Sequence, residues 1–139
     1  MKKEETLKSY GLKNTAPRSK ILQLLEEAKH RHLSAEDIFN QLRERGDDVG
    51  LATVYRVLNQ FEDVGLLVRH NFDTGLSVYE LDSGEHHDHL VCLHCSVVIE
   101  FVDDVIEKRQ LVVAAQHQFE VQHHSLVMYG VCAKCQSLA

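Results

Sequence analysis

The sequence predicts an α+β protein with a helical first part and a mixed second part. Its length of 139 residues suits one ordinary domain or two small ones. Helix-like periodicity dominates residues 19–64, and short strand-like runs follow it. Cationic and metal-ligand residue types also lie in different parts of the chain. Twelve of the fifteen Lys and Arg residues precede residue 84, whereas seven of the ten His residues follow it. We therefore expect domains at residues 1–82 and 86–139, joined by a hinge at 83–85.

The composition argues against several classes of protein. The net charge of −6 disfavours a protein that coats nucleic acid without sequence preference. No apolar run approaches the roughly 20 residues that a membrane helix needs. Residues 1–14 contain no apolar segment of the kind found in secretory signals. We therefore expect a cytoplasmic protein, in which the excess of cations over residues 1–20 leaves specific nucleic-acid binding open.

Three helices are predicted in the first part. Pro17 marks a helix start ahead of the apolar positions in residues 19–28. Ser34 and Asp37 have the spacing of a capping box, and apolar residues at helical spacing follow them. The third helix is expected over residues 52–64, with one apolar and one polar face.

A hairpin is predicted next, because strand-like runs at residues 66–72 and 77–81 flank a turn at 73–75. Three helices and a hairpin form the order of a winged helix-turn-helix domain. The polar face of the third helix offers side chains that can reach base edges: Thr53, Tyr55, Arg56, Asn59 and Gln60. A merely solvated face is the alternative for this helix alone. The basic start of the chain, which includes Lys13 and Arg18, and the hairpin favour DNA binding.

The second part is predicted to be a small α+β module. Strand-like runs occur at residues 90–92, 97–102 and 119–129. The segment 103–118 is expected to be a helix, capped by Asp103 or Asp104. About 55 residues after the hinge form a marginal core on their own. A bound metal ion that links distant parts of this module would therefore stabilise its fold.

All four cysteines lie in two Cys-x-x-Cys pairs, Cys92/Cys95 and Cys132/Cys135. In a chain without an export signal, metal binding by thiolates is a better default than a disulfide. Two pairs with no cysteine left over match a tetrahedral zinc site. Redox chemistry of the thioredoxin type is the main alternative.

The run His86-His87-Asp88-His89 is the densest group of metal-ligand types in the chain. In extended chain, His87 and His89 point to one face, whereas His86 and Asp88 point to the other. The run therefore predicts two half-sites that each need partners from elsewhere. The candidate partners are His32, Glu80, Glu100, Glu107, His123 and His124. Mixed imidazole and carboxylate ligands suit Fe(II), Zn(II), Mn(II) or Co(II).

Three segments carry specific motifs: Gly50-Leu-Ala-Thr-Val-Tyr-Arg-Val-Leu-Asn59, His86-His-Asp-His-Leu-Val-Cys-Leu-His-Cys95 and Cys132-Ala-Lys-Cys135. In these segments the chain resembles the ferric uptake regulator family, and the resemblance extends over nearly the whole sequence. It implies a homodimeric, metal-dependent repressor. It also implies an N-terminal winged-helix domain and a C-terminal α/β dimerisation domain.

The resemblance further implies three metal sites and a set of DNA contacts. The structural zinc site would consist of Cys92, Cys95, Cys132 and Cys135. The regulatory site, with Fe(II) as its ion and Mn(II), Co(II) or Zn(II) as substitutes, would consist of His32, Glu80, His87, His89 and Glu100. An additional site would consist of His86, Asp88, Glu107 and His124. On DNA, Lys13 would enter the minor groove, and Tyr55 and Arg56 would read the major groove.

Other functions stay open at this stage. Zinc, manganese, nickel and peroxide sensors share the scaffold of this family. Glu100 stands where peroxide-sensing relatives favour Asp, and no Cys is left for a zinc-sensing site, so iron control is favoured. A zinc hydrolase is a remote alternative, since four thiolates leave no open position for water. We expect no enzyme, and an A·T-rich palindromic operator bound by a dimer or a tetramer.

Overall fold

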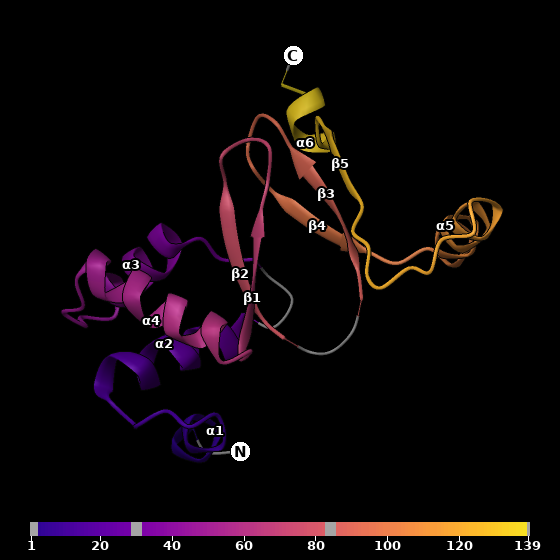
Figure 1. The fold of residues 1–139 in the computed structure, drawn as a ribbon. Helices are drawn as coiled ribbons and strands as arrows, with labels where there is room; N and C mark the ends of the chain where they lie inside the picture. The colour runs from indigo at the N-terminus through magenta and orange to yellow at the C-terminus, as the bar shows by residue number, and fades with distance from the viewer. Residues whose placement is uncertain (1–2, 29–31, 83–85, 139) are drawn as a thin grey trace. The chain divides into compact units, whose positions relative to one another are not determined.

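The computed structural model describes residues 3–28, 32–82 and 86–138 (Figure 1). The chain divides into two compact units, Met1–Ser83 and Gly84–Ala139. The hinge predicted at residues 83–85 lies outside the described residues. None of the described helices combines the length and the apolar character that crossing a membrane requires.

Four helices form most of the first unit: α1 (Lys3–Ser9), α2 (Ala16–Glu27), α3 (Ala35–Glu44) and α4 (Leu51–Asp63). The side chain of Thr15 caps α2, which is why this helix begins ahead of the predicted residue 19. Ser34 and Asp37 form the predicted capping box of α3. The sequence did not indicate α1, whose Leu7 is fully buried in the core.

The hairpin follows the helices as predicted. Strands β1 (Leu67–Asn71) and β2 (Ser77–Leu81) pair antiparallel, in a register that sets Leu67 opposite Leu81. Gly75 has a φ of +83° in the turn between them, a conformation that favours glycine. The core packs apolar side chains of all four helices, and Leu33 just before α3, against the hairpin: Leu7, Ile21, Leu24, Leu33, Ile38, Leu42, Val54, Leu58, Phe61, Leu67 and Tyr79. The first unit is therefore a winged helix-turn-helix domain with an extra N-terminal helix.

The second unit contains a three-stranded sheet of order β4-β3-β5. Its central strand β3 (Asp88–Cys92) pairs antiparallel with β4 (Val98–Phe101) and parallel with β5 (Val127–Gly130). Two helices complete the unit: α5 (Asp104–Gln116) and α6 (Ala133–Gln136). The side chain of Asp103 caps α5 by accepting hydrogen bonds from two amides of its first turn.

The strand predicted at residues 119–129 is wrong over most of its length, because β5 contains only Val127–Gly130. The central strand β3 pairs with β5 from His89 opposite Val127 to Cys92 opposite Gly130. Among the described residues, β3 begins at Asp88, so residues 119–126 have no further strand beside them to continue the ladder.

Apolar side chains of the second unit lie at its surface. No residue of α5 is buried, and Figure 1 shows this helix standing apart from the sheet of its own unit. The side chains of Val105 and Phe119 are 69% and 73% exposed, and Ile99 and Met128 of the sheet are also exposed. Extensive exposed apolar surface typically marks a protein interface. The second unit therefore has the surface that a dimerisation domain needs.

Candidate metal centres and DNA-binding residues

The four cysteines converge at one end of the sheet of the second unit. Cys92 ends β3, Cys95 lies in the following turn, and Cys132 and Cys135 lie at the start and in the body of α6. Their Sγ atoms all lie within 4.8 Å of one another, and those of Cys95 and Cys132 are 3.7 Å apart. Sulfurs about 2.3 Å from a tetrahedral zinc ion are about 3.8 Å apart. A disulfide needs about 2.05 Å, so the arrangement fits zinc and not a disulfide.

Backbone amides favour the charged form of Cys92. Hydrogen bonds from the amides of Cys95 and Cys132, each 3.4 Å from the Cys92 sulfur, lower the pKa of Cys92 to about 5, although burial opposes them. By contrast, interactions with the neighbouring thiols, first with Cys132, raise the pKa of Cys135 to about 12. Cys92 is therefore a thiolate at neutral pH, and metal binding would displace the proton of Cys135.

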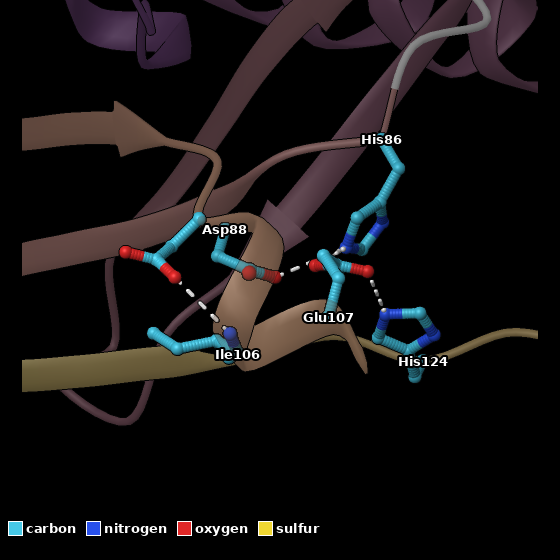
Figure 2. A network of polar contacts seen from close by, with 6 residues as sticks. His86, Asp88, Ile106, Glu107 and His124 are labelled. Carbon is cyan, nitrogen blue, oxygen red and sulfur yellow. Dashed lines mark hydrogen bonds and ion pairs between the residues drawn. The ribbon is translucent and has the colours of Figure 1, made fainter. Parts of the chain in front are cut away.

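A second cluster joins His86, Asp88, Glu107 and His124, as Figure 2 shows. His86 Nε2 lies 3.1 Å from both Asp88 Oδ1 and Glu107 Oε1, and His124 Nε2 lies 2.9 Å from Glu107 Oε2. Asp88 begins β3 and His86 lies two residues before it, whereas Glu107 comes from α5 and His124 from the segment before β5. The four residues that the family resemblance assigned to the additional site are thus brought together within one unit.

The donor set of this cluster suits a divalent cation. Asp88 is fully buried, and neither of its carboxylate oxygens makes a well-formed hydrogen bond with the described residues. Burial alone would raise the pKa of Glu107, but hydrogen bonding to His124 and the charges of His86 and His124 lower it. Two neighbouring carboxylates, one of them fully buried, need a compensating positive charge. A dication bound by imidazole and carboxylate would supply that charge.

Part of the expected regulatory site lies in the first unit. Glu80 of β2 places Oε2 3.2 Å from His32 Nε2 and Oε1 2.7 Å from His70 Nε2. The side chains of His32 and Glu80 are 1% and 11% exposed. One carboxylate is therefore shared by two imidazoles, which together can offer a metal ion nitrogen and oxygen ligands.

The remaining expected ligands lie in the second unit. The rings of His87 and His89 are 5.1 Å apart between centroids, and His87 Nε2 lies 3.5 Å from Glu100 Oε1. His89 of β3 pairs with Glu100 of β4 across the sheet. The structure thus gathers His87, His89 and Glu100 on one side and His86 with Asp88 on the other. The exposed His123 belongs to none of the groups of metal-ligand residues found among the described residues.

His70 is a member of the first-unit cluster that the sequence interpretation missed. Val68 pairs with Glu80 in the hairpin, and His70 is two residues along the same strand, so His70 and Glu80 share a face of the hairpin. The ring of His70 also stacks on Phe72, with an interplanar angle of 5°. The strand register is the signal that could have identified this residue.

We expect His70 to position Glu80 by a hydrogen bond. Replacing His70 with Ala should weaken Co(II) binding by about tenfold, since Glu80 loses a charge-assisted hydrogen bond. His70→Gln, whose amide reaches a similar point, should restore most of the affinity and the d–d absorption spectrum of bound Co(II). If His70→Gln and His70→Ala bind equally weakly and share a changed spectrum, His70 is a metal ligand instead.

The expected DNA-binding residues lie within the first unit. Lys13 precedes α2, and Thr53, Tyr55 and Arg56 lie in the first turns of α4. Lys13, Tyr55 and Arg56 are exposed, whereas Thr53 is half-buried. Half-buried Arg18 of α2 hydrogen-bonds within the domain. Because Tyr55 and Arg56 are exposed, the outer face of α4 is accessible to a DNA groove.

The hydroxyl of Tyr55 donates a 2.6 Å hydrogen bond to Glu36 Oε1 in the first turn of α3. This hydrogen bond lowers the pKa of Glu36 and raises that of Tyr55. At neutral pH the carboxylate is therefore charged and the phenol is protonated. The sequence interpretation did not include Glu36, because its spacing from Tyr55 follows from the packing of α3 on α4.

Comparison with known proteins agrees with this arrangement. The family model of the ferric uptake regulator family matches residues 9–129. The ferric uptake regulation protein of Legionella pneumophila is 55% identical over 136 residues, which cover 98% of this chain and 100% of that protein.

Solved structures are similar over both units. The ferric uptake regulator of Francisella tularensis with iron has a TM-score of 0.85 and 43% identity, and the match covers 91% of this chain and 96% of that one. The regulator Fur of Helicobacter pylori, with three functional metal-binding sites, has a TM-score of 0.84 and 34% identity, and the match covers 96% of this chain and 88% of that one. The chain therefore belongs to the ferric uptake regulator family, a family of DNA-binding transcription regulators and not of enzymes.

Proposed function

We propose that this chain is an iron-responsive repressor, which binds operator DNA of iron-uptake genes as a homodimer when loaded with Fe(II). The observation that carries the proposal is the separation of two kinds of ligand within one chain. Four cysteines form one cluster, whereas histidines and carboxylates form the others. A four-thiolate zinc site is closed and structural, and the mixed ligands suit an exchangeable dication such as Fe(II).

The regulatory ion, we propose, takes ligands from both units: His32 and Glu80 from the first, and His87, His89 and Glu100 from the second. Bound Fe(II) would supply the positive charge that holds these ligands together. Because the ligands belong to two domains, the loaded protein would favour one arrangement of the domains over others. A two-fold dimer must hold its reading helices at a spacing that DNA accepts. Metal loading would thereby control operator affinity.

The additional cluster of His86, Asp88, Glu107 and His124 would hold a further ion within the dimerisation domain. Its ligands all come from the second unit. An ion there would stabilise the position of α5, which contributes Glu107 and otherwise stands apart from the sheet (Figure 1). We therefore assign this site to the stability of the dimer, and the site of His32 and Glu80 to the response.

On DNA, we propose that Lys13 enters the minor groove while Tyr55, Arg56 and Thr53 face the major groove of an A·T-rich palindrome. Arginine reads guanine through two hydrogen bonds, and aromatic side chains contact thymine methyl groups. The dimer is the binding unit that a palindrome requires, and two dimers on adjacent sites would form the tetramer. A repressor acts where the DNA lies, which for a bacterial regulator is the cytoplasm.

The proposal is tested by fluorescence anisotropy on a labelled A·T-rich palindromic duplex under anaerobic conditions. Zinc-replete protein with added Fe(II) or Mn(II) should bind at least about tenfold more tightly than the same protein without a second metal. A shuffled duplex of equal composition provides the control. If Zn(II) alone saturates the response at lower free concentration than Fe(II) does at physiological levels, a zinc sensor is the better assignment.

We expect Arg56 to specify sequence and Lys13 to supply general affinity. Arg56→Ala should cost about 1–3 kcal/mol on the cognate duplex and reduce the preference between bases. Lys13→Ala should weaken all duplexes alike and lower the slope of log K against log salt by about one. Anisotropy titrations on cognate and mismatched duplexes over a range of salt measure both quantities. Unaltered base preference in Arg56→Ala would show that α4 is not the reader.

A further inference from the structure

The guanidinium of Arg18 joins two segments of the DNA-binding domain. Its Nε and Nη2 donate hydrogen bonds of 3.2 and 3.1 Å to Oε1 of Gln60, a residue of α4 that lies 42 positions along the chain. Its Nη1 donates a 2.8 Å hydrogen bond to the main-chain oxygen of Lys13. A single side chain of α2 thus bridges the segment before α2 and the helix α4.

The position of Gln60 on α4 determines which face of that helix Arg18 contacts. Gln60 lies four residues after Arg56, so both side chains project from the same side of the helix. Gln60 is half-buried, whereas Arg56 and Lys13 are exposed. The bridge therefore connects the backbone at Lys13 to the helix face that carries Arg56, while leaving the side chains of Lys13 and Arg56 open to a ligand.

The segment that carries Lys13 is anchored at both ends. After α1, Gly11 has a φ of +76°, and the amide of Leu12 donates a 2.8 Å hydrogen bond to the Leu7 carbonyl. At the other end, Thr15 caps α2. Between these anchors, the hydrogen bond from Arg18 holds the carbonyl of Lys13 itself.

We propose that Arg18 is a positioning residue, which fixes Lys13 relative to α4 so that the two DNA contacts meet their grooves together. The inference rests on the proposed function and adds a coupling between its two contacts. If Lys13 is held in place before binding, its contact with DNA loses little conformational freedom. Without the bridge, Lys13 must be ordered on binding, and most of its contribution is then lost.

Charge and geometry can be separated at this position. Lysine keeps the positive charge of Arg18 but lacks the planar fork that donates to two acceptors at once. Gln60→Ala leaves the charge of Arg18 intact and removes its acceptor on α4. Both changes should break the bridge, although the formal charge of the domain is unchanged in each.

The test is a double-mutant cycle with full-length, Mn(II)-loaded protein on the cognate duplex. Lys13→Ala should weaken binding by about tenfold in the native background, but by less than about threefold in the Arg18→Lys and Gln60→Ala backgrounds. Gln23→Ala is the matched control, because its amide bonds Glu27 at 3.0 Å within α2. In that background, Lys13→Ala should cost the same as in the native protein.

If Lys13→Ala reduces DNA affinity by the same factor in every background, the inference is overturned, since Arg18 would then act independently of Lys13. A thermal melt of each variant confirms that the domain is folded. If the native protein itself fails to bind the duplex, the proposed function fails, and the inference must be judged without DNA.

Backbone NMR relaxation of the DNA-free protein tests whether Arg18 positions Lys13. The order parameter of the Lys13 amide should be near about 0.85 in the native protein and fall below about 0.6 in Gln60→Ala and Arg18→Lys. The Gln23→Ala control should keep the native value. Equal order parameters in all four proteins would overturn the positioning role, whatever the result on DNA.

Discussion

Replacing Cys92 with Ser is expected to unfold the second unit and abolish dimerisation. The change removes the one thiol whose sulfur accepts hydrogen bonds from the amides of both Cys95 and Cys132. It also breaks the link between the two ends of the unit that the cysteine pairs provide. In small zinc domains, the free energy of metal binding is folding free energy, of order 10 kcal/mol. Circular dichroism melting, zinc content and sedimentation velocity would measure the three consequences.

The expected effect is large because the second unit has little core of its own. Among the described residues of this unit, Val91 and Cys92 are the apolar side chains that are buried, and Asp88 and His89 are the buried polar ones. The cluster of buried apolar side chains belongs to the first unit. Metal ligation and the dimer partner must therefore supply most of the stability that a core usually provides.

His94→Ala is the matched control for this prediction. His94 is exposed and lies between Cys92 and Cys95, but its side chain is outside the groups of metal-ligand residues found among the described residues. The His94→Ala protein should keep its zinc, its melting curve and its dimer. A dimeric Cys92→Ser protein with native melting behaviour would remove the structural role of the zinc site.

Local signals were sufficient to predict the starts of α3 and α5 and one strand of the hairpin. The capping box of Ser34 and Asp37 and the cap of α5 at Asp103 form as the sequence indicated. The hairpin strand at residues 77–81 also has its predicted bounds. At the two helix caps the side chains bond to neighbouring backbone amides, so the information is contained in a few consecutive residues.

Elements that depend on distant partners were predicted less well. The helix α1 is held by the burial of Leu7 in a core built from later residues, which no local pattern reveals. The length of β5 is set by where β3 begins, not by its own alternation of residues. The apolar side chains of α5, such as Val105 and Val113, are exposed in the single chain.

The metal ligands were likewise predicted where the signal is local and less well where it depends on distant residues. The Cys-x-x-Cys pairs indicated zinc directly, because each pair supplies two ligands from one turn. The run from His86 to His89 predicted two half-sites through its alternation, but the choice of Glu107 and His124 as partners came from the family resemblance. The place of His70 beside Glu80 follows from the hairpin register and from the tertiary position of β1 and β2.

The other large effect is expected from His32→Ala, which should leave metal binding measurable but remove most of the metal response on DNA. The proposed regulatory site keeps Glu80, His87, His89 and Glu100 in this variant. Glu80 also keeps its 2.7 Å hydrogen bond with His70, so the carboxylate stays in place. Loss of one imidazole should therefore reduce affinity for Mn(II) without destroying the site.

The loss on DNA should be greater than the loss in metal affinity. A ligand shifts a conformational equilibrium only through its preference for one state, and moving it from 1:99 to 99:1 requires about 5.5 kcal/mol. In our proposal, that preference comes from ligands contributed by both domains. Removing His32 weakens the contribution of the first unit, so the gain in DNA affinity on saturation with Mn(II) should fall from about 100-fold to below about fivefold.

Anisotropy titrations at saturating Mn(II) separate these two effects, since incomplete loading then no longer limits binding. His117→Ala provides the control, because His117 is exposed and lies outside the groups of metal-ligand residues found among the described residues. This variant should retain the full response. If saturated His32→Ala responds as strongly as the native protein, the ion does not act by joining the two domains. The response would then have to arise within the second unit, where His87, His89 and Glu100 lie together.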